Sequence, residues 1–396
     1  MHLLFVTSLV PQGLATTGYE IANQAVIDGL RRNGARVTVM GFTWPGKQAS
    51  EPESTIVLGS VDVRTEGADP LTKMKWVAQA VAGGYTIASA KMRVIEPEEI
   101  RAAMQKHGPF DGYVLNGVSL PGAFAGLFTD LPSIWVAHNV EYISARENAE
   151  TSDSALKRAL FRRDARILER LEHRLAAQSR FVFTLAEADR APLGVASQSR
   201  SACVPLVTMD LIPVSDAARK IRYDAGLIGT WTWQPNRVGL EWFISSIAPL
   251  FPEGFKVAVA GSLPEGLPVA PPCIEFVGRV ADAKDFVRSC AVIPLVARGG
   301  TGVQLKTIET FELGLPSVAT SSSLRGIDAR PDNCIVADDP QAFAAALGEL
   351  AAKTRAGLLP IGDGSQFHAA QRAALDKAIT KGLAALSAGA ASSIAA

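Results

Sequence analysis

The sequence predicts an α/β protein made of two Rossmann-like halves, each a doubly wound parallel sheet covered by helices. Short apolar runs, of the kind found in parallel strands buried on both faces, alternate with segments of helical periodicity. The alternation starts at the first residues and starts again near residue 225. Because this pattern is typical of parallel strands joined by helical crossovers, we expect one sheet in each half.

The first half opens on a strand, a loop and a helix. The apolar run 3–7 is expected to be a strand, and a loop with Gly13 and Gly18 follows it. Residues 21–33 carry apolar side chains at helical spacing, and Gly34 then ends the helix. Further strands are expected at 37–40, 112–115, 133–137 and 181–185.

The second half repeats the pattern. Strands are expected at 227–230, 257–261, 274–278, 291–296 and 317–320, and helices at 238–250 and 306–313. Residues 208–224 are weakly periodic and are expected to be a linker. We therefore expect an N-terminal domain at 1–207, a C-terminal domain at 208–365 that includes the linker, and a C-terminal helix and tail at 366–396.

The composition excludes several classes of protein. The chain has 396 residues, of which 48% are hydrophobic, so two domains can bury large cores. Its 39 basic and 39 acidic residues balance, which gives no overall basic field for nucleic acid. The four cysteines are far apart, which argues against a structural zinc site and a disulfide scaffold. With no signal-peptide pattern and no apolar run of roughly 18–20 residues, we expect a cytoplasmic protein.

Two segments of the first half leave alternatives open. Residues 71–93 are expected to form a helix-rich insertion whose Met and Trp side chains pack in the ordinary way rather than face a membrane. Residues 157–174 carry seven Lys or Arg residues, with Asp164, Glu169 and Glu172 among them. We expect a solvated helix stabilised by opposite charges four residues apart. The alternative is a cationic face towards anionic lipid or a charged acceptor.

A glycine-rich turn between an expected strand and an expected helix is the strongest local signal. It reads Arg298-Gly299-Gly300-Thr301-Gly302-Val303, and Lys306 and Glu309 follow on one face of the helix. Glycines let a ligand approach the backbone, and the N–H groups and dipole of a helix N-terminus attract an anion. The turn therefore suits a nucleotide diphosphate, with a carboxylate for the ribose. The alternative is an ordinary strand-to-helix turn.

Three ordered motifs resemble the family 4 group of retaining glycosyltransferases, which have the GT-B fold. Residues 299–316 are similar to that family's donor-site signature, and residues 229–243 to the opening of its second domain. The third match is His138-Asn139-Val140-Glu141-Tyr142, with the segment 181–190 downstream. The resemblance covers most of the chain and is weakest over 45–110. It implies two domains facing each other across a cleft, with the C-terminal helix packing back towards the N-terminal domain.

Carried over residue by residue, the resemblance gives Glu309 the role of binding the donor ribose. The family's preceding glutamate falls at Thr301, and its usual Arg/Lys pair is missing after residue 230. The pyrophosphate charge is thus left to Arg298, Lys306 and backbone groups, and both cations are expected to be catalytic. The other donor-binding positions that the resemblance implies are Gly229, Arg279, Val280, Gly299, Gly300, Thr301, Gly302 and Val303.

Other candidate residues carry two interpretations each. His138 follows an expected strand, where the carboxyl ends of parallel strands open onto a cleft. The resemblance implies a catalytic role at the donor sugar, and the alternative is a structural histidine. Gly13 and Gly18 resemble the family's acceptor-binding loop, and a tight turn is the alternative. Trp231 and Trp233 are expected either to stack on a base or sugar or to pack in the core.

The resemblance implies an enzyme that moves a sugar from a nucleoside diphosphate sugar to a hydroxyl acceptor with retention of configuration. It implies no cofactor and no metal. The expected partners are the nucleotide-sugar donor and a glycan, lipid-linked or small-molecule acceptor, with no nucleic acid and with peripheral contact to the inner face of a membrane. The alternatives are a non-catalytic GT-B subunit and a non-hydrolysing nucleotide-sugar 2-epimerase, which needs acid and base side chains beyond His138.

Overall fold

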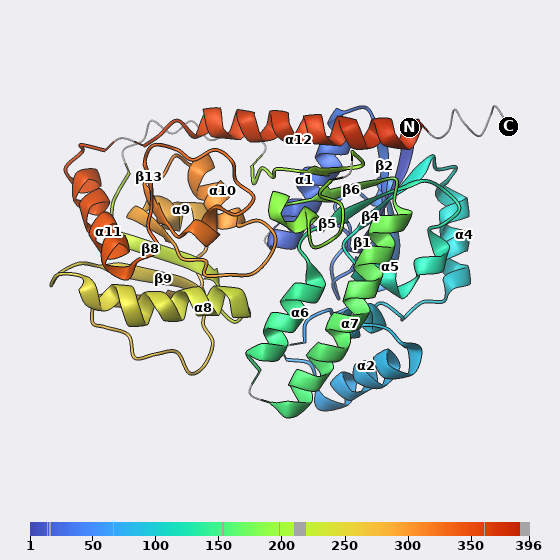
Figure 1. Ribbon diagram of the computed structural model, residues 1–396, viewed down its shortest axis with the longest axis horizontal. Helices are drawn as coiled ribbons and strands as arrows, with labels where there is room; N and C mark the ends of the chain where they lie inside the picture. Colours follow the sequence, from blue (N-terminus) through green and yellow to red (C-terminus); the bar gives the residue numbers. More distant parts are fainter. Residues whose placement is uncertain are drawn as a thin grey trace. The chain divides into compact units, whose positions relative to one another are not determined.

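The computed structural model describes residues 1–13, 15, 17–65, 67–152, 154–197, 199–209, 219–359 and 361–388 (Figure 1). The chain divides into unit 1, which is Met1–Leu206 with Ala373–Ala396, and unit 2, which is Val207–Arg372. Most of the predicted linker 208–224 and the end of the predicted tail lie outside the described residues. The second division falls within the last helix, whereas the sequence placed it at residue 365.

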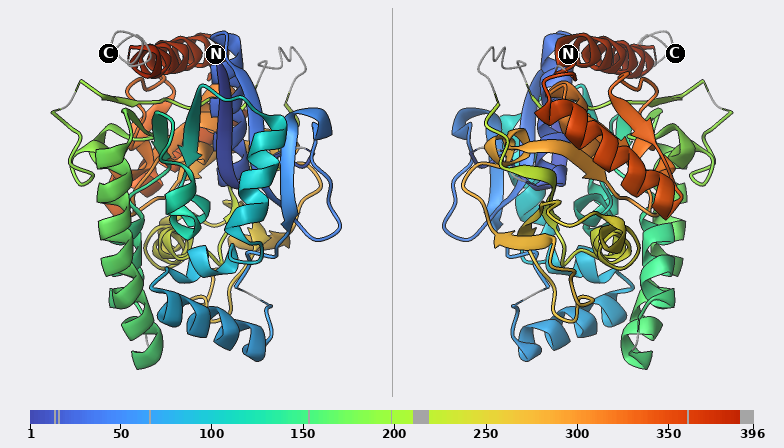
Figure 2. Two further views of the ribbon diagram at one scale, coloured as in Figure 1. Left: turned by 90° about the vertical axis from the view of Figure 1, so that its right-hand side faces the viewer. Right: turned by 90° about the vertical axis from the view of Figure 1, so that its left-hand side faces the viewer.

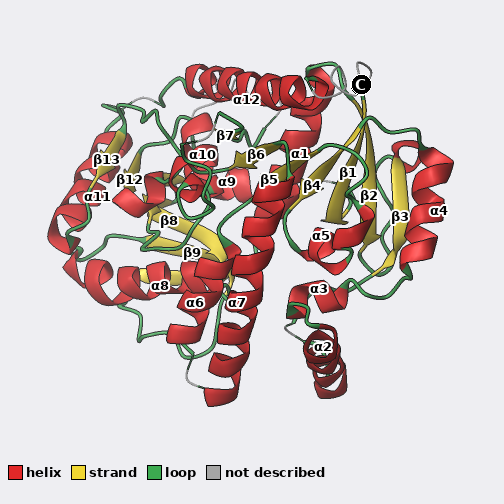
Figure 3. Ribbon diagram, turned by 45° about the vertical axis from the view of Figure 1, so that its right-hand side comes forward, coloured by secondary structure: helices red, strands yellow, loops and turns green. Residues whose placement is uncertain are grey.

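Unit 1 is built on a parallel sheet of seven strands in the order β3-β2-β1-β4-β5-β6-β7, with helices packed around it (Figure 3). The strands are β1 (His2–Leu9), β2 (Arg36–Thr43), β3 (Thr55–Ser60), β4 (Gly112–Asn116), β5 (Ser133–Ala137), β6 (Phe181–Thr184) and β7 (Ser201–Cys203). The helices are α1 (Gly18–Arg32), α2 (Pro70–Gly83), α3 (Ile87–Lys91), α4 (Pro97–His107), α5 (Ser119–Ala123), α6 (Glu141–Glu150) and α7 (Ala155–Gln178).

Unit 2 repeats this plan with six parallel strands in the order β10-β9-β8-β11-β12-β13. They are β8 (Tyr223–Thr230), β9 (Val257–Ser262), β10 (Ile274–Gly278), β11 (Cys290–Leu295), β12 (Ser317–Ala319) and β13 (Cys334–Val336). Its helices are α8 (Gln234–Trp242), α9 (Ala283–Arg288), α10 (Leu305–Glu312) and α11 (Pro340–Arg355), and α12 (Gly364–Ser387) begins in unit 2 and continues in unit 1. The predicted pair of Rossmann-like sheets is confirmed.

The strand order reverses at one point in each sheet. In unit 1 this point lies between β1 and β4, and in unit 2 between β8 and β11, and both pairs are parallel. At such a point the two crossover helices leave in opposite directions, so the carboxyl ends of the two strands are uncovered. Ligands of open α/β sheets bind there, which directs attention to the ends of these four strands.

Several elements differ from those that the sequence predicts. The edge strands β3, β7 and β13 are not predicted, because they are short and their apolar signal is weak. Helix α1 begins at Gly18 rather than after it, since Thr17 and Glu20 form a reciprocal capping box. Helix α8 begins at Gln234, with Pro235 in its first turn, where a missing N–H does no harm.

The last helix packs on unit 1, as expected. Leu375 and Ile379 are buried and lie against Gly29 of α1, where an added Cβ would come within 2.6 Å of Leu375. Asp376 accepts a hydrogen bond from Arg32 at 2.8 Å. These contacts join the two ends of the chain within unit 1.

Helix α2 lies at the periphery of unit 1 (Figure 2). Of its residues only Ala80 is buried, whereas Leu71 and Met74 are 76% and 66% exposed. The prediction that its Met and Trp side chains pack in the ordinary way is therefore wrong for Met74. The Trp76 ring does make a contact, since the Lys91 ammonium lies 4.5 Å from its centroid. None of the helices among the described residues has the length and apolar composition needed to span a bilayer.

Helix α7, all of whose residues are described, does not have the ion pairs between residues four apart that the sequence predicts. Asp164 accepts a hydrogen bond from the backbone N–H of Ile87, and Glu169 pairs with Arg146 on α6 at 2.8 Å. Glu172 is fully buried and accepts two backbone N–H groups, of Glu141 and Tyr142, at the start of α6. The acidic side chains of α7 thus hold neighbouring elements, and Asp164 also pairs with the adjacent Arg163 of the same helix at 2.8 Å.

Candidate functional site

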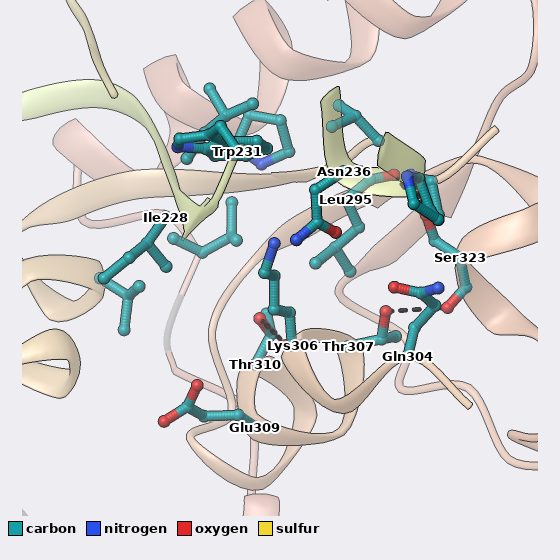
Figure 4. Close-up of a pocket in the computed structure, with 17 residues that line it drawn as sticks. Ile228, Trp231, Asn236, Leu295, Gln304, Lys306, Thr307, Glu309, Thr310 and Ser323 are labelled. Atoms are coloured by element: carbon teal, nitrogen blue, oxygen red, sulfur yellow. Dashed lines mark hydrogen bonds between the residues drawn. The ribbon is translucent and has the colours of Figure 1, made fainter. Parts of the chain in front are cut away.

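A small cavity lies in unit 2 at the point where the strand order reverses (Figure 4). It has a volume of about 40 Å³ and is bounded by the carboxyl ends of β8 and β11 and by the first turns of α10. The residues that line it are Leu227, Ile228, Trp231, Pro235, Asn236, Val287, Ile293, Pro294, Leu295, Val296, Ala297, Gln304, Lys306, Thr307, Glu309, Thr310 and Ser323. Two predicted site residues, Lys306 and Glu309, are therefore brought together here.

The ammonium of Lys306 lies between the Trp231 ring and the backbone at Gly229. It lies 4.6 Å from the centroid of the Trp231 ring, a cation–π geometry. It also occupies the space beside Gly229, where a Cβ would come within 2.4 Å of it. Burial lowers the pKa of Lys306 to about 8, against a smaller opposing effect of Glu309. The site thus keeps a partly desolvated cation at the carboxyl end of β8.

Glu309 lies one turn further along α10, and its carboxylate points away from the Lys306 ammonium (Figure 4). Burial raises its pKa, while Lys284 and Lys306 act in the opposite direction. Among the described residues, its carboxylate makes no ion pair with Lys306. A carboxylate and a cation held on one helix without neutralising each other can bind two different groups of one ligand.

A hydroxyl network fixes the helix against the strand. The Ser323 hydroxyl donates to the carbonyl of Leu295 at 2.7 Å and accepts from the N–H of Ala297 at 2.9 Å. The Thr307 hydroxyl donates to the carbonyl of Ser323 at 2.8 Å. Because these bonds are buried, they set the position of α10 relative to the end of β11 with little freedom.

The glycine-rich turn is clamped by an arginine that the sequence did not single out. Arg325 donates to the carbonyl of Gly302 at 2.7 Å, and to those of Gly299 and Thr301 at 3.4 and 3.3 Å. Gly300 and Gly302 have φ values of +94° and +74°, which residues with a side chain rarely adopt. The backbone conformation of the turn is therefore sufficient to explain why glycine occupies these two positions. Gly299 has no positive φ, and a Cβ on it would meet nothing within 4 Å.

Other predicted donor residues lie apart from this cavity. Arg298 is exposed, its guanidinium lies 4.5 Å from the Trp242 ring, and it reaches the carbonyl of Asp338 at 3.5 Å. Arg279 follows β10 and donates to the Ser262 hydroxyl at 3.1 Å, with Val280 next to it. Neither these residues nor the turn 299–303 line the cavity, although all of them follow carboxyl ends of strands in the same sheet.

The predicted aromatic residues separate into two environments. Trp231 is 2% exposed, and its ring N–H donates to the carbonyl of Ala260 at 2.8 Å. It is a core residue whose ring also contacts a cation. Trp233 is 52% exposed and precedes α8. Its ring is available to a ligand, as the stacking interpretation requires.

In unit 1, His138 belongs to a hydrogen-bonded cluster at the corresponding reversal point. Its Nε2 lies 2.8 Å from the Oδ1 of Asn116, at the end of β4, and its ring stacks on Tyr19 at 4.9 Å. The Asn116 amide donates to Thr7 of β1 at 3.2 Å and to Asn23 of α1 at 2.7 Å. Three strand ends and one helix therefore meet around this histidine.

The cluster fixes the charge and the tautomer of His138. Burial lowers its pKa to about 4, so the ring is neutral at pH 7. Since the Asn116 amide nitrogen is already a donor to its neighbours, Oδ1 must accept, and Nε2 of His138 carries the proton. The other ring nitrogen, Nδ1, is then an acceptor.

The two predicted acceptor glycines are placed differently from one another. Gly13 has a φ of +83°, and its N–H donates to the Ser50 hydroxyl at 2.6 Å. Gly18 is the first residue of α1 and not part of a loop, which corrects the sequence-based expectation. Leu14 and Thr16 between them lie outside the described residues. In the described part of the chain, no three His, Cys, Asp or Glu side chains gather as a metal site would require.

Sequence reasoning missed several residues of both sites. In unit 2 these are Asn236, Gln304, Ser323 and Arg325, and in unit 1 Thr7, Tyr19, Asn23 and Asn116. A usable signal exists for two of them: Thr7 and Asn116 are polar residues at the ends of runs predicted to be buried strands. Asn236 and Gln304 lie within the matched motifs 229–243 and 299–316, and for the remaining residues only tertiary packing brings the side chain to the site.

Comparison with known proteins gives one family. Residues 222–353 match the family described as glycosyl transferases group 1. The matched segment contains β8, the glycine-rich turn, Lys306 and Glu309, so a resemblance to group 1 glycosyl transferases is confirmed there. No match was found among curated protein sequences.

Solved structures similar to this chain share its fold. A sucrose-phosphate synthase from Thermosynechococcus elongatus aligns with a TM-score of 0.61 at 14% identity, covering 98% of this chain and 97% of that one. WaaG, a glycosyltransferase involved in lipopolysaccharide biosynthesis, aligns at 0.56 and 13% identity, covering 97% and 98%. Anabaena HepE in complex with UDP aligns at 0.54 and 12% identity, with the same coverage. The predicted GT-B fold is confirmed.

Proposed function

We propose that this chain is a glycosyltransferase that moves a sugar from a nucleoside diphosphate sugar to a hydroxyl acceptor with retention of configuration. The observation that carries the proposal is the placement of Lys306 and Glu309 on one helix at the reversal point of unit 2, within the segment that matches group 1 glycosyl transferases. The neighbour HepE, whose structure contains UDP, supports a nucleotide donor.

In this proposal the donor binds to unit 2. Lys306 attracts the diphosphate, the N-terminus of α10 adds its dipole, and Glu309 accepts hydrogen bonds from the ribose hydroxyls. When the bond to the sugar breaks, the leaving diphosphate gains negative charge. A fixed cation in a partly desolvated site then stabilises the transition state more than the ground state.

The acceptor is proposed to bind at the cluster of unit 1. A neutral His138 with Nδ1 as acceptor can take a hydrogen bond from a sugar hydroxyl. Its ring is held by Asn116 and Tyr19, so its position does not depend on the ligand. The proposed reaction uses no metal cofactor, as the resemblance implies, and Lys306 provides the positive charge on the diphosphate.

A donor screen followed by product analysis tests the proposal. The full chain is incubated with UDP-, GDP- and ADP-sugars, and release of the nucleoside diphosphate is measured with and without candidate acceptors. We expect one donor to release its nucleoside diphosphate slowly by hydrolysis when alone and faster by transfer of the sugar when an acceptor is present, in EDTA as well as in Mg²⁺. An α-configured product from an α-configured donor, read by NMR, is expected, whereas a β-configured product contradicts retention.

The same screen separates the proposal from a non-catalytic role. A non-catalytic subunit would bind a nucleotide sugar and raise the unfolding temperature without releasing nucleoside diphosphate. A 2-epimerase would invert carbon 2 of the sugar while the sugar stays attached to the nucleoside diphosphate. NMR of the recovered nucleotide sugar detects this change. Either result would overturn the proposed transfer reaction.

A further inference from the structure

Unit 1 contains a second, much larger cavity that the proposed reaction does not use. It has a volume of about 640 Å³ and lies where α3, α4, α5 and α7 approach one another, helices that can be followed in Figure 3. Four arginines line it, Arg93, Arg101, Arg170 and Arg174, against a single acidic residue, Glu98. In a chain whose charges balance overall, this cavity concentrates positive charge.

Helix α7 carries a regular series of arginines that leads to the cavity. Arg158, Arg162, Arg166, Arg170 and Arg174 follow one another at intervals of four residues. Like charges at this spacing repel, and none of the acidic residues of α7 pairs with an arginine of this series: Glu169 and Glu172 bind other elements, and Asp164 binds Ile87 and Arg163. Of this series, Arg170 and Arg174 line the cavity, where an anion bound between them would relieve their mutual repulsion.

Arg93 shows that the cavity is partly preorganised. One of its N–H groups donates to the carbonyl of Ala123 at 3.1 Å. Its guanidinium lies 5.1 Å from the ring of Tyr85 and 5.0 Å from that of Phe124. A guanidinium fixed by a carbonyl and two rings loses little entropy when it binds an anion, and its fork of donors suits a phosphate.

A smaller cavity of about 220 Å³ adjoins the first. The two share Ala125, Leu171 and Arg174 as lining residues. Most of the remaining walls are apolar, including Leu115, Phe128, Leu131 and Leu175. A cationic cavity that opens beside an apolar one matches a ligand with an anionic end and a hydrocarbon end.

We propose that these two adjoining cavities of unit 1 bind an amphiphile, with its phosphate group among Arg93, Arg101, Arg170 and Arg174 and its hydrocarbon part against Leu171 and the smaller cavity. The proposal stands on unit 1 alone and does not depend on the proposed glycosyl transfer. Its test is therefore a binding measurement without donor, so that the two can fail separately.

The experiment measures binding of monomeric dihexanoyl phosphatidic acid to the full chain by calorimetry. The comparison ligands are glycerol 3-phosphate, which lacks the hydrocarbon, and dihexanoylglycerol, which lacks the phosphate. We expect phosphatidic acid to bind at least tenfold more tightly than either. If glycerol 3-phosphate binds as tightly as phosphatidic acid, the site takes a free phosphate. If dihexanoylglycerol binds as tightly, the arginines play no part. Either result overturns the proposal.

A matched pair of variants tests the placement. The double variant Arg170→Gln, Arg174→Gln removes two charges from the larger cavity, and Arg174 also lines the smaller one. A tenfold or larger loss of affinity is expected. Arg162→Gln with Arg166→Gln removes the same charge from exposed positions of the same helix that do not line either cavity, and a loss below twofold is expected. Equal losses, or binding only to anionic vesicles, would show a cationic surface without a built site and would overturn the proposal.

Discussion

The ammonium of Lys306 lies 4.6 Å from the centroid of the Trp231 ring, in space that Gly229 leaves by having no side chain. Trp231 is itself fixed, because its ring N–H donates to the carbonyl of Ala260 at 2.8 Å. The cation is therefore positioned by the core of unit 2 and not by a carboxylate. Such a cation attracts an anion more strongly than one in bulk water, since less solvent screens it.

Replacing Lys306 by Ala should lower kcat at least tenfold, which corresponds to about 1.4 kcal/mol, with a smaller effect on the Kd of the donor. The reason is that the leaving diphosphate gains charge in the transition state. Steady-state kinetics and calorimetry measure the two quantities. Lys353→Ala, which removes the same charge from an exposed position on α11, is the control and should change neither. A loss in Kd alone would show that Lys306 only binds the donor.

The pH dependence of activity should report the lowered pKa of Lys306. Because burial lowers this pKa to about 8, the ammonium is protonated at pH 7 and loses its charge as the pH rises through 8. We expect kcat/KM to be level below that value and to fall tenfold per pH unit above it. In Lys306→Arg, whose guanidinium stays charged, the alkaline fall should disappear. Its persistence would assign the titration to another group.

The buried ammonium of Lys306 should lower the free energy of unfolding relative to an uncharged side chain at the same position. The pKa is lower in the folded chain than the ordinary 10.5, so the unfolded chain binds more protons between pH 8 and 10.5. The burial cost is complete below pH 8 and fades as the pH rises towards 10.5. We expect Lys306→Met to raise the free energy of unfolding by about 1–2 kcal/mol at pH 7. Denaturant titrations at pH 7 and pH 10 should show this gain shrinking, and a destabilised variant would contradict it.

The sequence predicts both sheets and the glycine-rich turn that leads to α10, because buried parallel strands and glycine-rich turns leave strong local signals. It does not predict where Arg298 points. Its neighbours in sequence suggested a phosphate contact, whereas Trp242, 56 residues earlier in the chain, provides a ring that its guanidinium covers at 4.5 Å. Likewise, Arg325 clamps the turn from a segment with no motif of its own. Contacts between distant segments are set by packing, which local periodicity does not encode.

Glu309→Gln should weaken binding of the nucleoside diphosphate. The amide is neutral and accepts hydrogen bonds from ribose hydroxyls less strongly than the carboxylate, and such charge-assisted bonds contribute roughly 1.5–3 kcal/mol. Calorimetry with the diphosphate that the screen identifies measures the change. Glu349→Gln, at an exposed position on α11, provides the control. An unchanged Kd in Glu309→Gln would remove this residue from the nucleotide site.

Gly299 separates the two interpretations of the glycine-rich turn. Gly300 and Gly302 need their positive φ values, so their presence says nothing about a ligand. Gly299 has no such need, and a Cβ there would meet nothing within 4 Å. If the turn is only a connection, Gly299→Ala should be harmless or should stabilise the fold by about 0.4–1 kcal/mol, through the smaller entropy of the unfolded chain.

If the bare backbone of this turn approaches the diphosphate, the added methyl group stands in the way. We therefore expect Gly299→Ala to keep or raise the free energy of unfolding and to weaken donor binding at least tenfold. Gly300→Ala is the comparison, because its φ of +94° makes alanine strained, by roughly 1–3 kcal/mol, whether or not a ligand binds there. Loss of affinity without loss of stability is a combination that only close approach of a ligand explains. A stable Gly299→Ala variant with unchanged affinity would place the diphosphate away from this turn.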